Sequence, residues 1–133
     1  MEVNPLANKK ILLIDDEQDI RMVVQLSLET VGGFDVLVAE SGEAGLDMAA
    51  HEKPDAILLD VMMPGLDGPS TLERLKTLDG CAAIPVIFLT AKAQQAEVRR
   101  LKDLGPAGVL TKPFDPMTLS DQVNEILRES RDA

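Results

Sequence analysis

The chain has 133 residues, of which 45% are hydrophobic, and its formal net charge is −10. This length fits one domain whose core needs no metal or disulfide, and the single cysteine, Cys81, favours a reducing, cytoplasmic compartment. The acidic charge argues against non-specific binding to nucleic acid and against adhesion to an anionic membrane. No apolar run approaches the roughly 20 residues that cross a bilayer, so we expect a soluble protein.

Short apolar runs alternate with segments of helical periodicity along the chain. The apolar runs end at polar residues, as expected for strands buried on both faces of a parallel sheet. The predicted strands are 10–14, 34–39, 56–59, 85–89 and 108–110. The predicted helices are 19–31, 42–51, 69–78, 94–104 and 119–129.

This alternation predicts an α/β fold, a (βα)5 doubly wound, flavodoxin-like sandwich. Five parallel strands in the order 2-1-3-4-5 carry helices on both faces. Without a linker or an internal repeat, we expect one domain over residues 9–130, a flexible N-terminal segment at 1–8 and a short tail at 131–133. Met1 and these short ends favour a stand-alone protein.

Charged and polar residues follow the predicted strands at their carboxyl ends. Asp15 and Asp16 follow the first strand, Asp60 the third, Thr90 the fourth, and Lys112 the fifth. In an open parallel sheet, ligands bind beyond these ends, at the point where the strand order reverses. The sequence therefore predicts that three carboxylates, a hydroxyl and an ammonium group meet at one edge.

Three clustered carboxylates repel one another, and a divalent cation would relieve that repulsion. A ligand set made of oxygen atoms suits Mg²⁺, and the sole histidine, His51, lies far along the chain from the cluster, which argues against zinc. Phosphoryl transfer needs a nucleophile, a metal and donors to the phosphoryl oxygens. Asp60 can be the nucleophile, while Thr90 and Lys112 can be the donors.

Each of these residues also has a plainer interpretation when it is taken alone. Asp15 and Asp16 could form a turn or cap a helix, Thr90 could cap the fourth helix, and Lys112 could be a surface lysine. Two other functions share the fold or the chemistry. A phosphohydrolase would usually have an Asp-x-Asp pattern after the first strand and a cap or extra loops, whereas Asp15 and Asp16 are adjacent and the chain is short. A flavin-binding module would need a Ser/Thr-rich loop after the first strand and aromatic residues around the ring, and this chain has no Trp or Tyr.

Four motifs resemble the receiver domains of two-component response regulators, over about residues 9–128. They are Ile-Leu-Leu-Ile-Asp-Asp-Glu at 11–17, Leu-Leu-Asp-Val-Met-Met-Pro-Gly-Leu-Asp-Gly at 58–68, Phe-Leu-Thr-Ala-Lys at 88–92 and Lys-Pro-Phe at 112–114. Their order and their positions at predicted strand ends make the match specific. The resemblance implies a phosphoacceptor at Asp60 and a phosphoryl donor, either a sensor histidine kinase or a histidine phosphotransfer protein.

The resemblance also implies roles for individual groups. Asp16, Asp60 and the backbone carbonyl of Met62 would contact Mg²⁺ directly, and Asp15 would act partly through water. The backbone N–H of Ala91 would bind the phosphoryl group. By the same analogy the peptide bond between Lys112 and Pro113 is cis, and the chain catalyses only its own phosphorylation and dephosphorylation, so it is not an enzyme.

Signalling would pass through the face of the fourth helix, fifth strand and fifth helix to an unidentified protein target. Many receivers carry an aromatic residue or histidine three positions before the final lysine, where this chain has Val109. The acidic and aromatic pattern of receivers that dimerise through this face is also absent from the fifth-strand edge. We therefore expect a monomer or a weak dimer, and a switch that works without an aromatic side chain.

Overall fold

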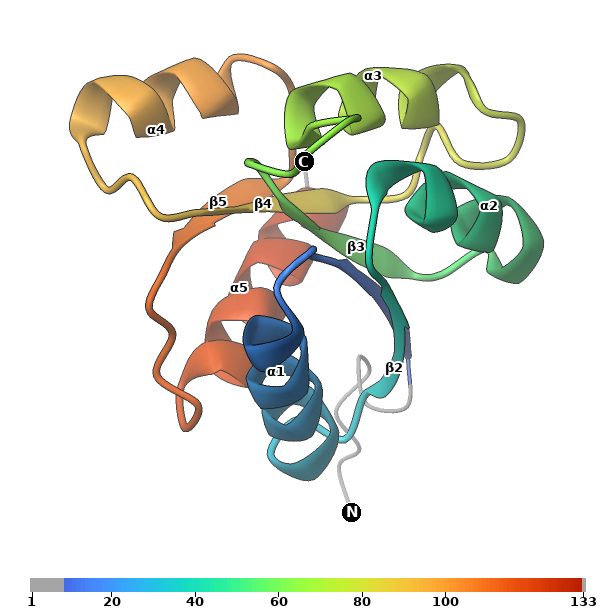
Figure 1. The fold of residues 1–133 in the computed structure, drawn as a ribbon. Coiled ribbons are helices and arrows are strands. Elements are labelled where there is room, and N and C mark those ends of the chain that lie inside the picture. Colours follow the sequence, from blue (N-terminus) through green and yellow to red (C-terminus); the bar gives the residue numbers. More distant parts are fainter. Residues whose placement is uncertain (1–8, 133) are drawn as a thin grey trace.

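The computed structural model describes residues 9–132, so the expected flexible segment 1–8 and residue 133 lie outside the described residues. Strands and helices alternate along the described chain (Figure 1). The strands are β1 (Lys10–Ile14), β2 (Asp35–Ala39), β3 (Ala56–Asp60), β4 (Val86–Thr90) and β5 (Gly108–Thr111). The helices are α1 (Gln18–Thr30), α2 (Gly42–Glu52), α3 (Gly68–Thr77), α4 (Gln95–Lys102) and α5 (Leu119–Asp132).

The five strands form one parallel sheet in the order β2-β1-β3-β4-β5, which confirms the predicted fold class and topology. The register aligns Ile14 with Leu59, Leu59 with Phe88, and Thr90 with Thr111. The carboxyl ends of the strands therefore lie level at one edge. The order reverses between β1 and β3, which places the residues after these two strands beside each other.

Alternate side chains of each strand enter two separate cores, one on each face of the sheet. Ile11, Leu13 and Leu58 face α1 and α5, whereas Leu12 and Ile57 face the opposite core. That second core includes side chains from α2, α3 and α4, and the two groups of helices lie on opposite sides of the sheet in Figure 1. None of the helices within residues 9–132 has both the length and the apolar character needed to cross a membrane.

Several helix boundaries differ from those the sequence predicts. Helix α3 begins at Gly68, one residue before the expected Pro69, because the Asp67 carboxylate accepts a hydrogen bond from the N–H of Ser70 at 2.8 Å. Helix α5 continues through Asp132, so two residues of the expected tail are helical.

Helix α4 is shorter than the expected 94–104. It ends at Lys102, and the carbonyl of Leu104 instead accepts a hydrogen bond from Lys76 Nζ on α3 at 2.6 Å. Residues beyond Lys102 therefore turn toward α3 through a tertiary contact that helical periodicity does not encode.

Candidate functional site

The edge formed by the carboxyl ends of the strands brings together three of the predicted residues through direct contacts. Asp15 follows β1, Asp60 ends β3, and Lys112 follows β5. Lys112 Nζ lies 3.1 Å from Asp15 Oδ2 and 3.2 Å from Asp60 Oδ1. Asp15 has no exposed surface and Asp60 is 4% exposed, so this is a buried ion triad. Buried charges of this kind require partners, which each of the three groups supplies to the others.

The carboxylates at this edge form a compact acidic cluster. One oxygen from each of Asp15, Asp16, Glu17 and Asp60 lies within 4.8 Å of the others. Asp15 and Asp60 are buried, while Asp16 and Glu17 reach solvent. The donor set consists of oxygen atoms, which are the ligands that Mg²⁺ prefers. The residues present therefore fit the cation that the sequence predicts.

Burial and the neighbouring Asp15 carboxylate raise the pKa of Asp60 to about 6, although the charge and hydrogen bond of Lys112 act in the opposite direction. Burial alone would lower the pKa of Lys112, but its hydrogen bonds and charge interactions with Asp15 and Asp60 outweigh that cost and raise it. The ammonium group therefore stays charged at neutral pH, and the carboxylate of Asp60 stands in an environment with excess negative charge.

Two residues outside the predicted set also belong to this edge. Glu17 Oε1 lies 3.7 Å from Lys112 Nζ, and the guanidinium of Arg21 donates to the backbone carbonyl of Asp15 at 2.7 Å. Glu17 directly continues the acidic pair, and Arg21 lies four residues further, on the same side of a helix. That spacing places Arg21 near Glu17, whereas its contact with the Asp15 carbonyl is visible only in the structure.

Thr90 ends β4 and is 2% exposed. Its Oγ1 accepts a hydrogen bond from the N–H of Lys92 at 3.0 Å, which leaves the hydroxyl hydrogen free to be donated. Ala91 follows on an exposed loop, and Met62 lies on the loop after β3 with its side chain 66% exposed. The roles predicted for the Ala91 N–H and the Met62 carbonyl remain predictions.

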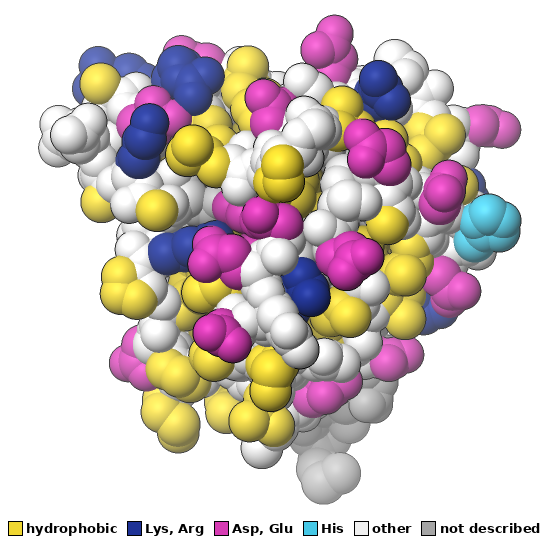
Figure 2. All heavy atoms as spheres, in the orientation of Figure 1, with side chains coloured by type: hydrophobic (Ala, Val, Ile, Leu, Met, Phe, Trp, Pro, Cys, Tyr) yellow, Lys and Arg dark blue, Asp and Glu magenta, His cyan; other side chains and the backbone are white. Residues whose placement is uncertain are grey.

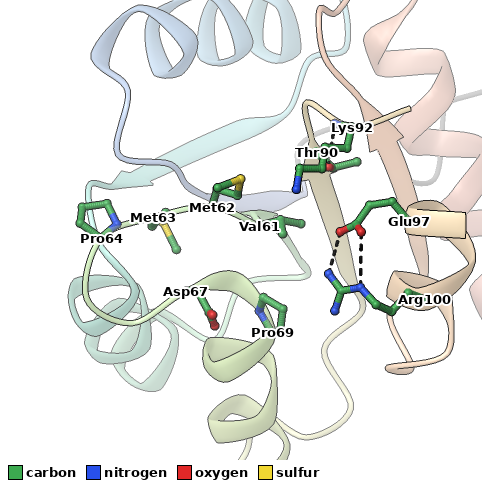
Figure 3. Close-up of a pocket in the computed structure, with 10 residues that line it drawn as sticks. All are labelled: Val61, Met62, Met63, Pro64, Asp67, Pro69, Thr90, Lys92, Glu97 and Arg100. Carbon is green, nitrogen blue, oxygen red and sulfur yellow. Dashed lines mark hydrogen bonds and ion pairs between the residues drawn. The ribbon is translucent and has the colours of Figure 1, made fainter. Parts of the chain in front are cut away.

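A cavity of about 680 Å³ opens between the loop after β3 and helix α4 (Figure 3). Thr90 and Lys92 are among the residues that line it. On the α4 side of the cavity, Arg100 Nη2 pairs with Glu97 Oε1 at 2.6 Å (Figure 3). Lys and Arg side chains gather over α4, whereas Asp and Glu side chains dominate the middle of the same molecular face (Figure 2).

Two backbone features shape the rim of the site. A Cβ atom on Gly68 would lie 2.5 Å from the carbonyl oxygen of Asp60, so α3 begins in direct contact with the end of β3. The Lys112–Pro113 peptide bond is cis, as the family resemblance implies.

Comparison with known proteins gives a family match over most of the chain. The model of the response regulator receiver domain matches residues 11–124. The alkaline phosphatase synthesis transcriptional regulatory protein PhoP of Bacillus subtilis is 42% identical over 123 residues, covering 92% of this chain and 50% of that protein. The chain spans about half the length of several of the curated relatives it matches.

Two other relatives are covered over nearly their full length. Sporulation initiation phosphotransferase F of Bacillus subtilis is 34% identical over 122 residues, covering 92% of this chain and 96% of that protein. The structure of the chemotaxis protein CheY4 of Vibrio cholerae superposes with a TM-score of 0.82 at 29% identity, covering 90% of this chain and 99% of the other. The chain belongs to the response regulator receiver domain family, whose members act in phosphorylation-dependent two-component signalling.

Proposed function

We propose that Asp60 accepts a phosphoryl group from a phosphohistidine carried by a sensor histidine kinase or a histidine phosphotransfer protein. The observation that carries this proposal is the position of Lys112 Nζ, which lies between the carboxylates of Asp15 and Asp60 at 3.1 and 3.2 Å. An ammonium group in that position neutralises the acceptor before transfer and can follow the negative charge onto the phosphoryl oxygens afterwards.

In the transfer step, a carboxylate oxygen of Asp60 forms a bond to phosphorus while the phosphorus–nitrogen bond of the donor breaks. The electron pair of the broken bond stays on the histidine nitrogen. Lys112 and the Thr90 hydroxyl stabilise the charge on the phosphoryl oxygens, and the backbone N–H of Ala91 adds a further donor. Because Thr90 Oγ1 is only an acceptor in its bond to Lys92 N–H, its hydrogen is available for this role.

Mg²⁺ would be held by Asp16 and Asp60, with Asp15 acting partly through water and the Met62 carbonyl completing the protein ligands. When bound, it supplies positive charge to the phosphoryl oxygens. The cluster of carboxylates supports this assignment, because it has four members and Lys112 Nζ pairs with three of them, Asp15, Glu17 and Asp60.

We further propose that residues 9–130 act as one receiver unit in the cytoplasm, as a monomer or weak dimer, and that the chain catalyses only its own phosphorylation and dephosphorylation. The response passes from Thr90 to the face of α4, β5 and α5, where a protein target binds. Val109, which is half-buried against the core beneath α4, replaces an aromatic switch residue, so the shift at this face is small.

The test is incubation with acetyl phosphate and Mg²⁺, followed by intact-mass measurement. Wild type should gain the mass of one phosphoryl group, and Asp60→Asn should gain none. Asp47→Asn, which changes an exposed carboxylate on α2, is the matched control and should behave as wild type. Equal modification of Asp60→Asn and wild type would refute the acceptor assignment, as would an unmodified wild type when phosphohistidine donors are also offered.

A further inference from the structure

Every hydrogen-bonding atom of Asp15 has a partner from this chain. Its N–H donates to the Ala39 carbonyl at 3.1 Å. Oδ1 accepts from the Glu17 N–H at 2.9 Å, and Oδ2 accepts from Lys112 Nζ at 3.1 Å. Its carbonyl oxygen accepts from Arg21 Nη1 at 2.7 Å. Because Asp15 has no exposed surface, water cannot readily replace the Arg21 guanidinium as the donor to this carbonyl.

We infer that Arg21 is a positioning residue for the metal-binding turn, an inference that rests on the proposed Mg²⁺ site. The carbonyl that Arg21 holds belongs to the rigid, planar peptide unit that links Asp15 to Asp16. Fixing the direction of this carbonyl fixes the orientation of the unit, and with it the point from which the Asp16 side chain departs.

Arg21 makes two hydrogen bonds to this turn, and only the one from its side chain depends on the guanidinium. Its backbone N–H donates to the Glu17 carbonyl at 3.0 Å, and its side chain reaches back to the Asp15 carbonyl at 2.7 Å. The turn that carries three of the clustered carboxylates is thus tied to the first turn of α1. Groups that orient metal ligands in this way contribute to affinity although they do not touch the metal.

The charge of Arg21 and its hydrogen bond have opposite effects on a cation. A guanidinium is charged at all relevant pH values, so near the cluster it repels Mg²⁺. The hydrogen bond orders the ligands and favours Mg²⁺. If positioning dominates, removal of Arg21 weakens Mg²⁺ binding, and if charge dominates, removal strengthens it. The sign of the change therefore identifies the role.

The experiment measures Mg²⁺ binding by calorimetry in wild type, Arg21→Met, Arg21→Lys and Arg74→Met. Arg21→Met should raise the dissociation constant about tenfold, the lower end of the loss caused by removing a partner that orients a ligand. Arg21→Lys, which keeps the charge and one point of donation, should fall between wild type and Arg21→Met. Arg74 is exposed on α3, so Arg74→Met is the control and should bind Mg²⁺ as tightly as wild type does.

Phosphorylation by acetyl phosphate supplies a second measurement. In Arg21→Met, the Mg²⁺ concentration for half-maximal rate should rise about tenfold, while the rate at saturating Mg²⁺ stays close to wild type. A variant that is only less stable would have a lower free energy of unfolding, but it would not need more Mg²⁺ to reach its half-maximal rate. If Arg21→Met does not fold, Arg21→Lys still decides, because it must bind Mg²⁺ more weakly than wild type.

The two proposals fail in different ways. Unchanged or tighter Mg²⁺ binding in both Arg21 variants, with wild type phosphorylated normally, overturns the role of Arg21 alone. A wild type that binds Mg²⁺ but is never phosphorylated, with weaker Mg²⁺ binding in Arg21→Met, overturns the phosphoryl transfer and leaves the positioning role intact. A wild type that does not bind Mg²⁺ overturns the Mg²⁺ assignment and with it the role of Arg21, while the acceptor role of Asp60 is decided by the intact-mass measurement.

Discussion

The turn after β1 and helix α4 are attached to the same edge of the sheet, but they are held very differently. Asp15 in the turn is fully buried, and each of its polar atoms is hydrogen-bonded. Among the described residues of α4, Leu101 alone is buried. The N-cap residue of this helix, Gln94, forms no capping hydrogen bond with its side chain. The turn is also acidic, whereas residues 92–102 carry four basic residues and one glutamate.

Under the proposed function, this contrast separates the place of phosphoryl transfer from the place that responds to it. Elements with few buried contacts open at a lower free-energy cost than core elements do. The acidic turn therefore keeps its geometry while α4 can move. Thr90 ends β4 at the same edge of the sheet, and its Oγ1 holds the Lys92 N–H at the start of the segment that leads into α4.

The same core substitution in the central sheet that carries the acidic turn and in α4 gives the largest expected contrast. Leu58 in β3 and Leu101 in α4 both have no exposed surface. Leu58→Ala should cost about 4 kcal/mol of unfolding free energy, since strands on both sides hold the cavity open, and Leu101→Ala about 2 kcal/mol, since α4 can shift inward. Urea unfolding followed by circular dichroism measures both values. Leu104→Ala, which alters a side chain that is 37% exposed, is the control. Equal costs for Leu58 and Leu101 would remove the contrast.

Replacing one lysine that contacts the acidic cluster and one that lies on α4 tests where phosphoryl transfer takes place. Lys112→Ala should lower the initial rate of phosphorylation about a hundredfold, equivalent to about 2.7 kcal/mol, because a preorganised cation is lost from the transition state. Lys102→Ala on exposed α4 should leave this rate unchanged. Both rates follow from intact mass against time with acetyl phosphate. A normal rate in Lys112→Ala would mean that the ion triad is structural.

The pH dependence of the unfolding free energy should come from the carboxylate cluster, through Asp60. The pKa of Asp60 is about 6 in the folded protein, above its ordinary value of 3.8. Its contribution to stability is therefore full below about pH 3.8 and is lost as the pH rises through 6. In metal-free protein with chelator, the loss should be on the order of 2–3 kcal/mol, at about 1.4 kcal/mol per pKa unit. Asp60→Asn should lack this loss, and Glu97→Gln on α4 should keep it. The same slope in Asp60→Asn would assign the loss to other groups.

The smallest effect concerns the connection between the regions. Thr90→Val keeps the side-chain shape but removes the acceptor of the Lys92 N–H. One neutral hydrogen bond contributes about 1 kcal/mol, so exchange of the Lys92 amide hydrogen should become roughly fivefold faster. Thr77→Val, which removes a hydroxyl that donates to the Arg74 carbonyl on α3, is the matched control. An unchanged exchange rate at Lys92 would show that Thr90 does not hold this segment.

Much of the site follows from the sequence because strand ends are easy to recognise. The runs before Asp15, Asp60 and Thr90 are apolar and short, and parallel pairing places their ends together whatever the details of the loops. Lys112 follows from the same reasoning, and the family motifs support it. The parallel sheet follows from these runs and from their alternation with helices, whereas the order 2-1-3-4-5 is that of the flavodoxin-like fold.

The remaining features depend on three-dimensional contacts. The helical pattern of α1 says which residues face the core, but it does not say that Arg21 reaches back to the Asp15 carbonyl. The end of α4 depends on the contact between Lys76 and Leu104, which are far apart in the sequence. The start of α3 is a local exception, because Asp67 caps it through the N–H of Ser70, only three residues further along the chain.

The close approach of α3 to the end of β3 limits which sequences can carry this site. At position 68, even the smallest side chain would enter the space of the Asp60 backbone, 2.5 Å from its carbonyl oxygen. Even alanine at this position should therefore disturb the geometry of the acceptor, and larger or charged side chains are not needed for that effect. Redesign of specificity in this protein has to leave that residue untouched and work from the loop around Met62 or from α4.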